Sequence, residues 1–210
     1  MKEIWAEAVM ALGGTPDSGD LETRYAEPHR RYHNTTHVLA VVRDARTLAE
    51  HLMLTDEERA ILTLAACAHD VIYDGRPGED ERASAQWARD HLTDIRPEHA
   101  ERVADLVLAT ITHESADPLA HALLDADLAI LGAPRADYDE YRINVRAEYA
   151  RYDDATWSAG RTRVLRSLLD RKRLYVTEPA HRLWDAGARA NMVRELRLLS
   201  PGPAGPAARP

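Results

Sequence analysis

The chain has 210 residues, of which 45% are hydrophobic and 30% charged, a composition typical of one globular domain with a substantial core. No apolar run approaches the roughly 20 residues of a membrane span, and the acidic N-terminus is unlike a secretory signal, so we expect a cytoplasmic protein with no membrane partner. The net charge of −8 argues against an extended nucleic-acid surface, and the single cysteine, Cys67, excludes a disulfide framework and a thiolate zinc site.

The sequence predicts one helix after another. Apolar residues recur at helical spacing over residues 2–12 and 34–52. Thr55 and Glu58 have the spacing of a capping box, which opens a helix over residues 55–69. Further helices are expected over residues 79–92, 97–113, 118–131, 136–151, 157–173 and 179–199.

No run of alternating apolar and polar residues supports a sheet. The predicted fold class is therefore all-α, a single-domain bundle of about eight to nine helices over residues 1–199. Residues 200–210 are rich in Pro, Gly and Ala and predict a disordered tail.

Two pairs of residues at the start and end of predicted helices are candidate metal ligands. His33 and His37 are four residues apart, so they share one helical face if their helix begins early enough. His69 and Asp70 follow a fully apolar segment, where a charged group is costly unless it is paired or bound to a metal. Both can reach one ion only near the end of their helix, because adjacent helical residues point about 100° apart.

A third pair, Asp125 and Asp127, lies inside the predicted helix 118–131. The two are separated by one residue, so only one of them is expected to face a shared centre, and spacing leaves open which one. Imidazole and carboxylate ligands together suit a divalent ion such as Mn²⁺, Fe²⁺, Co²⁺, Ni²⁺, Zn²⁺ or Mg²⁺, with one or two ions both open. Such a set leaves coordination positions for water and substrate, as in a catalytic site.

The order H…HD…D resembles the HD superfamily of metal-dependent phosphohydrolases. The segments EPHRRYHNTTH, AACAHDVIYD, EDERASAQWA, LDADLAILG, INVRAEY and GRTRVLRSLLDRKRLY are similar to a bacterial subfamily of predicted HD phosphohydrolases. The resemblance implies an HD-type helical bundle in which the metal ligands are His37, the signature pair His69 and Asp70, and Asp127. It also implies that Asp125 supports the ligands rather than binding the ion.

RYHNTTH is also similar to the Y-H-N-x-x-H motif of cyclic-nucleotide phosphodiesterases, which implies that His33 donates a proton to the leaving oxygen. A helix-capping or supporting role is the alternative for His33. Those enzymes carry a histidine four residues after the signature histidine, where this chain has Tyr73, which we assign to substrate binding.

Two-metal relatives have extra ligands before the last aspartate, and Glu81 and His113 hold the best positions for them here. Glu81 is expected to orient water or bridge to a second ion, with a solvated acid at a helix N-terminus as the alternative. His113 is expected to contact the bound water or the phosphate. Both are therefore candidate catalytic residues.

Arg142 and Arg146 stand one turn apart in the predicted helix 136–151. Either is a candidate for holding the substrate phosphate, and a pair on a helix surface is the alternative.

Together these residues predict a phosphohydrolase that uses a metal-activated water to hydrolyse a small phosphorylated substrate, a nucleotide or a related compound. Asp70 is expected to act as metal ligand and proton acceptor, and His33 or His113 to serve the leaving group. A di-iron HD-type oxygenase and a non-catalytic nucleotide-binding module are the alternatives. The sequence leaves open the substrate, the native metal and whether the chain forms a homodimer.

Overall fold

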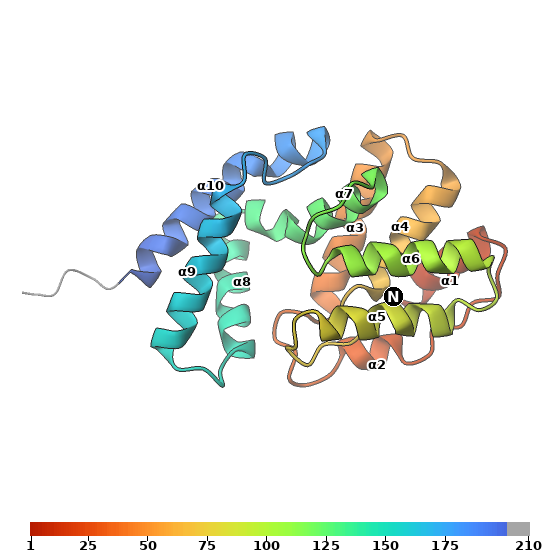
Figure 1. Ribbon diagram of the computed structural model, residues 1–210, viewed down its shortest axis with the longest axis horizontal. Helices are drawn as coiled ribbons and strands as arrows, with labels where there is room; N and C mark the ends of the chain where they lie inside the picture. Colours follow the sequence, from red (N-terminus) through yellow and green to blue (C-terminus); the bar gives the residue numbers. More distant parts are fainter. Residues whose placement is uncertain (201–210) are drawn as a thin grey trace, which may run out of the picture.

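The computed structural model describes residues 1–200, which form ten α-helices and one 3₁₀ helix with no strand among them (Figure 1). The predicted all-α class is confirmed. The number of helices exceeds the expected number because the short α2 was not foreseen: five residues are too few to show a helical apolar stripe. The tail predicted for residues 200–210 lies, after Ser200, outside the described residues.

The elements are α1 (Lys2–Ala11), α2 (Leu21–Tyr25), α3 (Thr35–His51), α4 (Asp56–Ala68), α5 (Glu79–His91), α6 (Pro97–Ala109), α7 (Pro118–Asp127), the 3₁₀ helix η1 (Leu128–Gly132), α8 (Arg135–Glu148), α9 (Asp154–Asp170) and α10 (Glu178–Leu199). Figure 1 shows two groups of helices, α1–α7 and α8–α10, with η1 between them. In the described part of the chain, no helix has both the length and the hydropathy that crossing a bilayer requires.

Helix α4 is the central element of the first group. The predicted capping box is present, because Thr55 accepts from the backbone of Glu58 while the Glu58 carboxylate accepts from the backbone of Thr55. Every residue from Ala60 to Ala68 is buried against the surrounding helices, and burial raises the pKa of the Cys67 thiol to about 12. Cys67 is thus an unreactive core residue. His69 and Asp70 follow α4 directly, so this buried helix determines where they lie.

Helix α3 begins later than a shared histidine face requires. Asn34 is its N-cap, and the Asn34 side chain accepts from the backbone of Thr36 at 2.9 Å. His33 therefore precedes the helix, so the condition under which His33 and His37 would share one helical face is not met. The two rings still approach each other, with centroids 5.5 Å apart.

Helices α6 and α7 end earlier than predicted, and both ends lie near the candidate site. α6 stops at Ala109, where the Thr110 hydroxyl bonds back to the carbonyl of Val107 at 2.7 Å. α7 stops at Asp127, and the chain continues as the tighter η1. The predicted helices 97–113 and 118–131 therefore include residues that leave the α-helical path.

One continuous cluster of buried apolar side chains runs from Trp5 on α1 to Met192 on α10, so the two groups of helices share a core. Where helix α10 crosses η1, the backbones of the two elements are in contact. A Cβ atom on Gly132 would lie 2.6 Å from the Cβ of Trp184 and 2.7 Å from its carbonyl oxygen, so only glycine permits this approach.

Candidate metal centre

Three side chains meet where α3 and α4 adjoin. His37 lies in the first turn of α3, His69 follows the last residue of α4, and Asp70 comes next in the chain. The Nε2 atoms of His37 and His69 are 3.2 Å apart, and Asp70 Oδ2 is 3.4 Å from the first and 3.1 Å from the second. One ligand atom of each residue thus lies within 4.8 Å of the others, a group that could hold a metal ion.

Asp127, the last residue of α7, approaches the same point and completes what we call the His–Asp cluster: His37, His69, Asp70 and Asp127. Its Oδ1 atom lies 3.4 Å from His37 Nε2 and 3.5 Å from His69 Nε2. Ligands about 2.1 Å from one ion lie about 3.0–3.5 Å from their neighbours. The spacings among His37, His69 and Asp70 therefore fit a single ion, and Asp127 lies at a similar distance from both imidazoles.

The donor set also fits a cation. The Nδ1 atom of His69 lies 2.9 Å from the carbonyl oxygen of Ala66, which can only accept, so Nδ1 donates to it and Nε2 is the ring nitrogen that faces the cluster. Against the effect of burial, Asp70 and Asp127 raise the pKa of His69 well above its usual value, so a bound ion would replace the proton at Nε2. Imidazole with carboxylate suits Mn²⁺, Fe²⁺, Co²⁺, Ni²⁺, Zn²⁺ or Mg²⁺. The imidazoles are buried at 3% and 1% side-chain exposure, whereas the two carboxylates retain 18% and 17% and so border open space.

The cluster keeps its carboxylates ionised. Burial alone would raise the pKa of Asp70 and Asp127, but the imidazoles beside them hold the pKa of each well below its usual range. Both groups are therefore carboxylates at neutral pH, the form that binds a metal ion.

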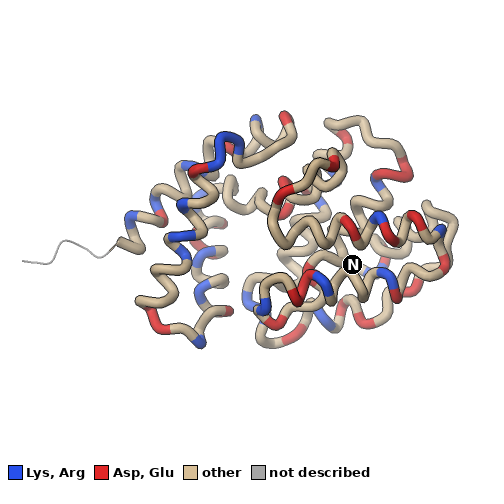
Figure 2. Tube along the Cα trace, viewed as in Figure 1, with Lys and Arg blue, Asp and Glu red and all other residues tan. Residues whose placement is uncertain are grey.

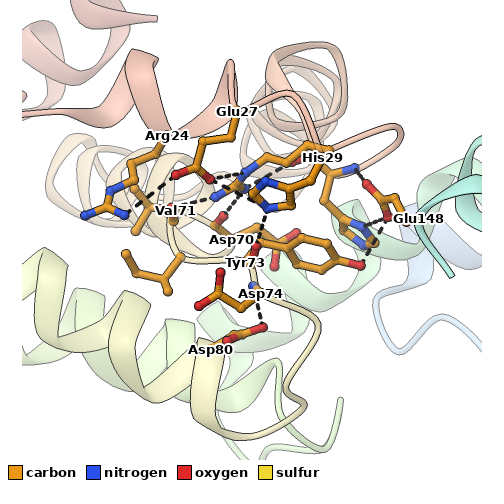
Figure 3. A network of polar contacts seen from close by, with 12 residues as sticks. Arg24, Glu27, His29, Asp70, Val71, Tyr73, Asp74, Asp80 and Glu148 are labelled. Atoms are coloured by element: carbon orange, nitrogen blue, oxygen red, sulfur yellow. Dashed lines mark hydrogen bonds and ion pairs between the residues drawn. The ribbon is translucent and has the colours of Figure 1, made fainter. Parts of the chain in front are cut away.

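Arg30 fixes the turn that follows α4. Its side chain is fully buried, and it donates to the carbonyl oxygens of His33 at 3.1 Å, Asp70 at 2.6 Å and Val71 at 2.8 Å. Glu27 balances its charge at 3.0 Å. Figure 3 shows Glu27, Asp70 and Val71 gathered in this network. The segment before α3 and the turn after α4 are thereby held in a single arrangement.

Beside the cluster, His33 is paired with Glu148, a residue that the sequence did not single out. Glu148 ends α8, and its Oε2 atom lies 2.6 Å from His33 Nδ1 and accepts from the Tyr73 hydroxyl at 3.1 Å (Figure 3). Its Oε1 atom accepts from the backbone N–H groups of residues 31–33 at 2.8–2.9 Å. Against the effect of burial, the contacts with His33 lower the pKa of Glu148 to about 2.

A cavity of about 170 Å³ opens beside the cluster. The candidate residues that line it are His33, Asp70, Tyr73, Glu81, His113 and Asp127. The ring of Tyr73 stacks on that of His33 with centroids 4.2 Å apart. Because Glu148 engages the Nδ1 atom of His33, the Nε2 edge of the ring is the one left for the cavity. Most of the residues predicted from the sequence thus share one small space.

His113 reaches this space through an unusual backbone conformation. Its φ of 52° lies in the left-handed region, which is uncommon for residues other than glycine and is often found at functional sites. After the early end of α6, this turn brings its Nε2 atom to 3.0 Å from Asp127 Oδ2. His113 is thus placed to orient the carboxylate of Asp127.

Glu81 combines a structural contact with a place at the cavity. Its Oε2 atom accepts from the backbone of Gly78 at 2.6 Å, which caps α5 as expected of an acid at a helix N-terminus. The contact with Gly78 agrees with the alternative role of Glu81, an acid at a helix N-terminus. Because Glu81 also lines the cavity, its water-orienting role stays a prediction.

Asp125 is directed away from the cluster. Its buried carboxylate accepts from the backbone of Val176 at 2.8 Å and from the backbone and hydroxyl of Thr177, both at 2.7 Å. The expectation that Asp125 supports the metal ligands is therefore wrong, because it secures the connection between α9 and α10.

The two arginines of α8, Arg142 and Arg146, do not line the cavity beside the cluster. Arg146 donates to the carbonyls of Tyr149 and Tyr152 and to Asp154 at 2.7–3.0 Å, so it holds the turn between α8 and α9. Arg142 lies 3.9 Å from Asp139. It lines neither the cavity beside the cluster nor a second, larger cavity bordered by α3, η1 and α8. Their predicted role in phosphate binding does not agree with this placement. Figure 2 shows the other Lys and Arg residues of the C-terminal part spread over α8, α9, α10 and the connection between α9 and α10.

No family model matches this chain, and neither the curated proteins nor the solved structures contain a significant match to it.

Proposed function

We propose that this protein is a metal-dependent phosphohydrolase of the HD superfamily that acts in the cytoplasm on a small phosphate ester, such as a nucleotide or a related compound. The supporting observation is that the two carboxylates of the His–Asp cluster, which lie beside its two buried imidazoles, line a cavity that His33 also lines, and that Glu148 pairs with His33. This combination offers a cation site and a proton donor side by side, and hydrolysis of a phosphate ester uses both.

A divalent ion held by the cluster would lower the pKa of a water molecule and polarise a phosphoryl oxygen. In the hydrolysis, a water oxygen bonds to phosphorus, the bond to the alcohol oxygen breaks, and that oxygen takes up a proton. His33 is the proposed donor, because Glu148 holds its Nδ1 atom and its Nε2 atom has no partner among residues 1–200. Asp70 is the proposed acceptor of the proton that the water loses, and His113 keeps Asp127 in place.

The test is elemental analysis of the purified protein together with phosphate release from a panel of esters. We expect about one equivalent of a divalent metal and phosphate release that a chelator abolishes. Asp70→Ala should lose both metal and turnover, whereas the control Asp105→Ala, at an exposed position of α6, should retain both. Full activity in Asp70→Ala would refute the assignment.

The same experiment separates the other two functions considered. Oxygen uptake by the iron-loaded protein without phosphate release from any ester would replace the proposal by an oxygenase. Tight nucleotide binding without turnover across the metals tested would replace it by a binding module.

A further inference from the structure

A second and larger cavity reaches the His–Asp cluster through His37 and Asp127. It measures about 580 Å³ and is bordered by α3, η1 and α8; we call it the side chamber. Residues with little or no side chain form much of its wall: Ala40, Ala126, Ala129, Gly132 and Ala133. Binding pockets for organic ligands usually measure about 300–1,000 Å³. The side chamber is in this range, whereas the 170 Å³ cavity has room for little more than a phosphate group.

Five neutral polar side chains of the side chamber have no hydrogen-bond partner within residues 1–200: Tyr32, Thr36, Tyr141, Asn144 and Trp184. The hydroxyls of Tyr32 and Tyr141 and the amide of Asn144 are not sealed from solvent. Elsewhere in the molecule the hydroxyls of four tyrosines are bonded: those of Tyr25, Tyr73, Tyr138 and Tyr175. Polar groups left free inside a hollow are available to a ligand.

Tyr32 connects the chamber to the cluster. Its ring centroid lies 4.7 Å from that of His37 and 4.7 Å from that of Tyr141. A molecule with its phosphate at the cluster therefore has a continuous aromatic wall along which its remaining part can extend.

The charges at the rim disfavour an anionic ligand part. Arg43 and Asp44 neutralise each other through two contacts of 2.9 Å. Arg31, Asp137 and Glu140 also line the chamber, are exposed and form no ion pair within the described residues. One unpaired cation and two unpaired anions therefore lie at the rim, and Asp127 adds a further negative charge where the chamber meets the cluster.

We propose that the side chamber binds the alcohol part of the phosphate ester, and that this part is a neutral hydroxylated ring. The ring can come from a sugar phosphate or from the ribose of a nucleoside monophosphate, which share this chemistry. The proposal rests on the proposed phosphohydrolase function and adds the class of substrate. Hydroxyls of the ring would pair with Tyr32, Tyr141 and Asn144, which otherwise have no protein partner.

The test compares kcat/KM for glucose 6-phosphate and AMP with that for ethyl phosphate, which has no ring. We expect at least one ring-bearing ester to be preferred by about tenfold or more, and Tyr141→Phe and Asn144→Ala each to lower this preference by about fivefold to tenfold. The matched controls are Tyr152→Phe, which removes an exposed hydroxyl, and Ile143→Ala, which changes the exposed side of the same helix. The relative rates for glucose 6-phosphate and AMP identify the source of the ring.

Hydrolysis of ethyl phosphate at an equal or greater kcat/KM, or a preference that both variants leave intact, would overturn the proposal and leave the phosphohydrolase function standing. If no ester is hydrolysed, the phosphohydrolase function fails, and the chamber is tested through tryptophan fluorescence, since Trp184 lines it. Saturable quenching by adenosine or methyl glucoside that Asn144→Ala weakens would support the chamber as a ring site. Absence of quenching would refute it.

Discussion

At the scale of single residues, Asp125 and Asp127 show how two carboxylates of one helix take different roles, because residues two apart point about 200° away from each other. Asp127 contacts both imidazoles of the cluster, whereas Asp125 accepts three hydrogen bonds from the start of α10 and its connection. Helical geometry requires that only one of two such neighbours face a given point. The contacts with the rest of the fold decide which one it is.

The paired substitutions Asp127→Asn and Asp125→Asn should therefore fail in different ways. Asp127→Asn is expected to lose metal, because an amide is a weaker ligand than a carboxylate. Asp125→Asn is expected to retain metal and to lower the free energy of unfolding by about 1–3 kcal/mol, since its buried hydrogen bonds are weakened. Metal content and urea unfolding measure the two effects. Metal loss in Asp125→Asn with Asp127→Asn unaffected would reverse the assignment.

Glu148 is the residue whose carboxylate positions the proposed proton donor. Glu148→Gln retains an oxygen for the backbone N–H groups but removes the charge that faces His33. We expect kcat to fall by roughly tenfold or more while metal content stays the same. Turnover and elemental analysis of the same sample test this, with Glu3→Gln on the exposed side of α1 as the matched control. Loss of metal together with turnover would indicate a purely structural role.

At the scale of elements, helices α8, α9 and α10 are joined by contacts of one buried carboxylate, that of Glu195. The Glu195 carboxylate on α10 accepts from Arg161 on α9 at 3.0 and 3.1 Å and from the Tyr138 hydroxyl on α8 at 2.5 Å. Glu195 and Arg161 are only 1% and 8% exposed. The desolvation of both charges offsets most of their attraction, so such a pair adds little to the free energy of unfolding. Removal of one partner, however, leaves a buried charge uncompensated.

Glu195→Ala is therefore expected to lower the free energy of unfolding by about 3–5 kcal/mol, whereas the double variant Arg161→Met with Glu195→Leu should recover most of that loss. The matched control is Glu178→Ala, which breaks the exposed pair with Arg173 and should leave the free energy of unfolding nearly unchanged. Denaturant unfolding measures all three. A double variant as unstable as Glu195→Ala would show that the hydrogen bonds, and not the uncompensated charge, determine stability.

At the scale of the whole molecule, the cluster connects segments that are distant in sequence. Its four residues come from α3, from the turn after α4 and from the end of α7, and the same helices pack together in the core. A metal that binds only the folded chain stabilises the whole of it by mass action. Metal binding and global stability should therefore be linked.

We expect a chelator to lower the melting temperature of the metal-loaded protein by roughly 5 °C or more, which corresponds to the ~2.7 kcal/mol gained at a hundredfold excess over Kd. His69→Ala should melt at the same temperature with and without chelator. The control His51→Ala, at an exposed position, should respond as the unaltered protein does. A melting temperature of the unaltered protein that does not respond to chelation would contradict the cluster as a metal site.

The sequence by itself determined the helices and the candidate residues that need only local geometry. Helical periodicity, the capping box of Thr55 and Glu58 and the prolines at helix starts are short-range signals, so the elements of the bundle follow from them. The placement of His69 and Asp70 at a helix end was likewise readable from the apolar run before them.

Only the tertiary structure decided which side chains share the site. Glu148 meets His33 across 115 residues, and no spacing rule extends over such a distance; its one sequence signal was its place in the segment INVRAEY. Arg146 had the residue type of a phosphate ligand, but the carbonyls of a nearby turn engage its guanidinium. Long-range partners depend on how the helices pack, and that packing minimises the free energy of the whole core rather than of any one segment.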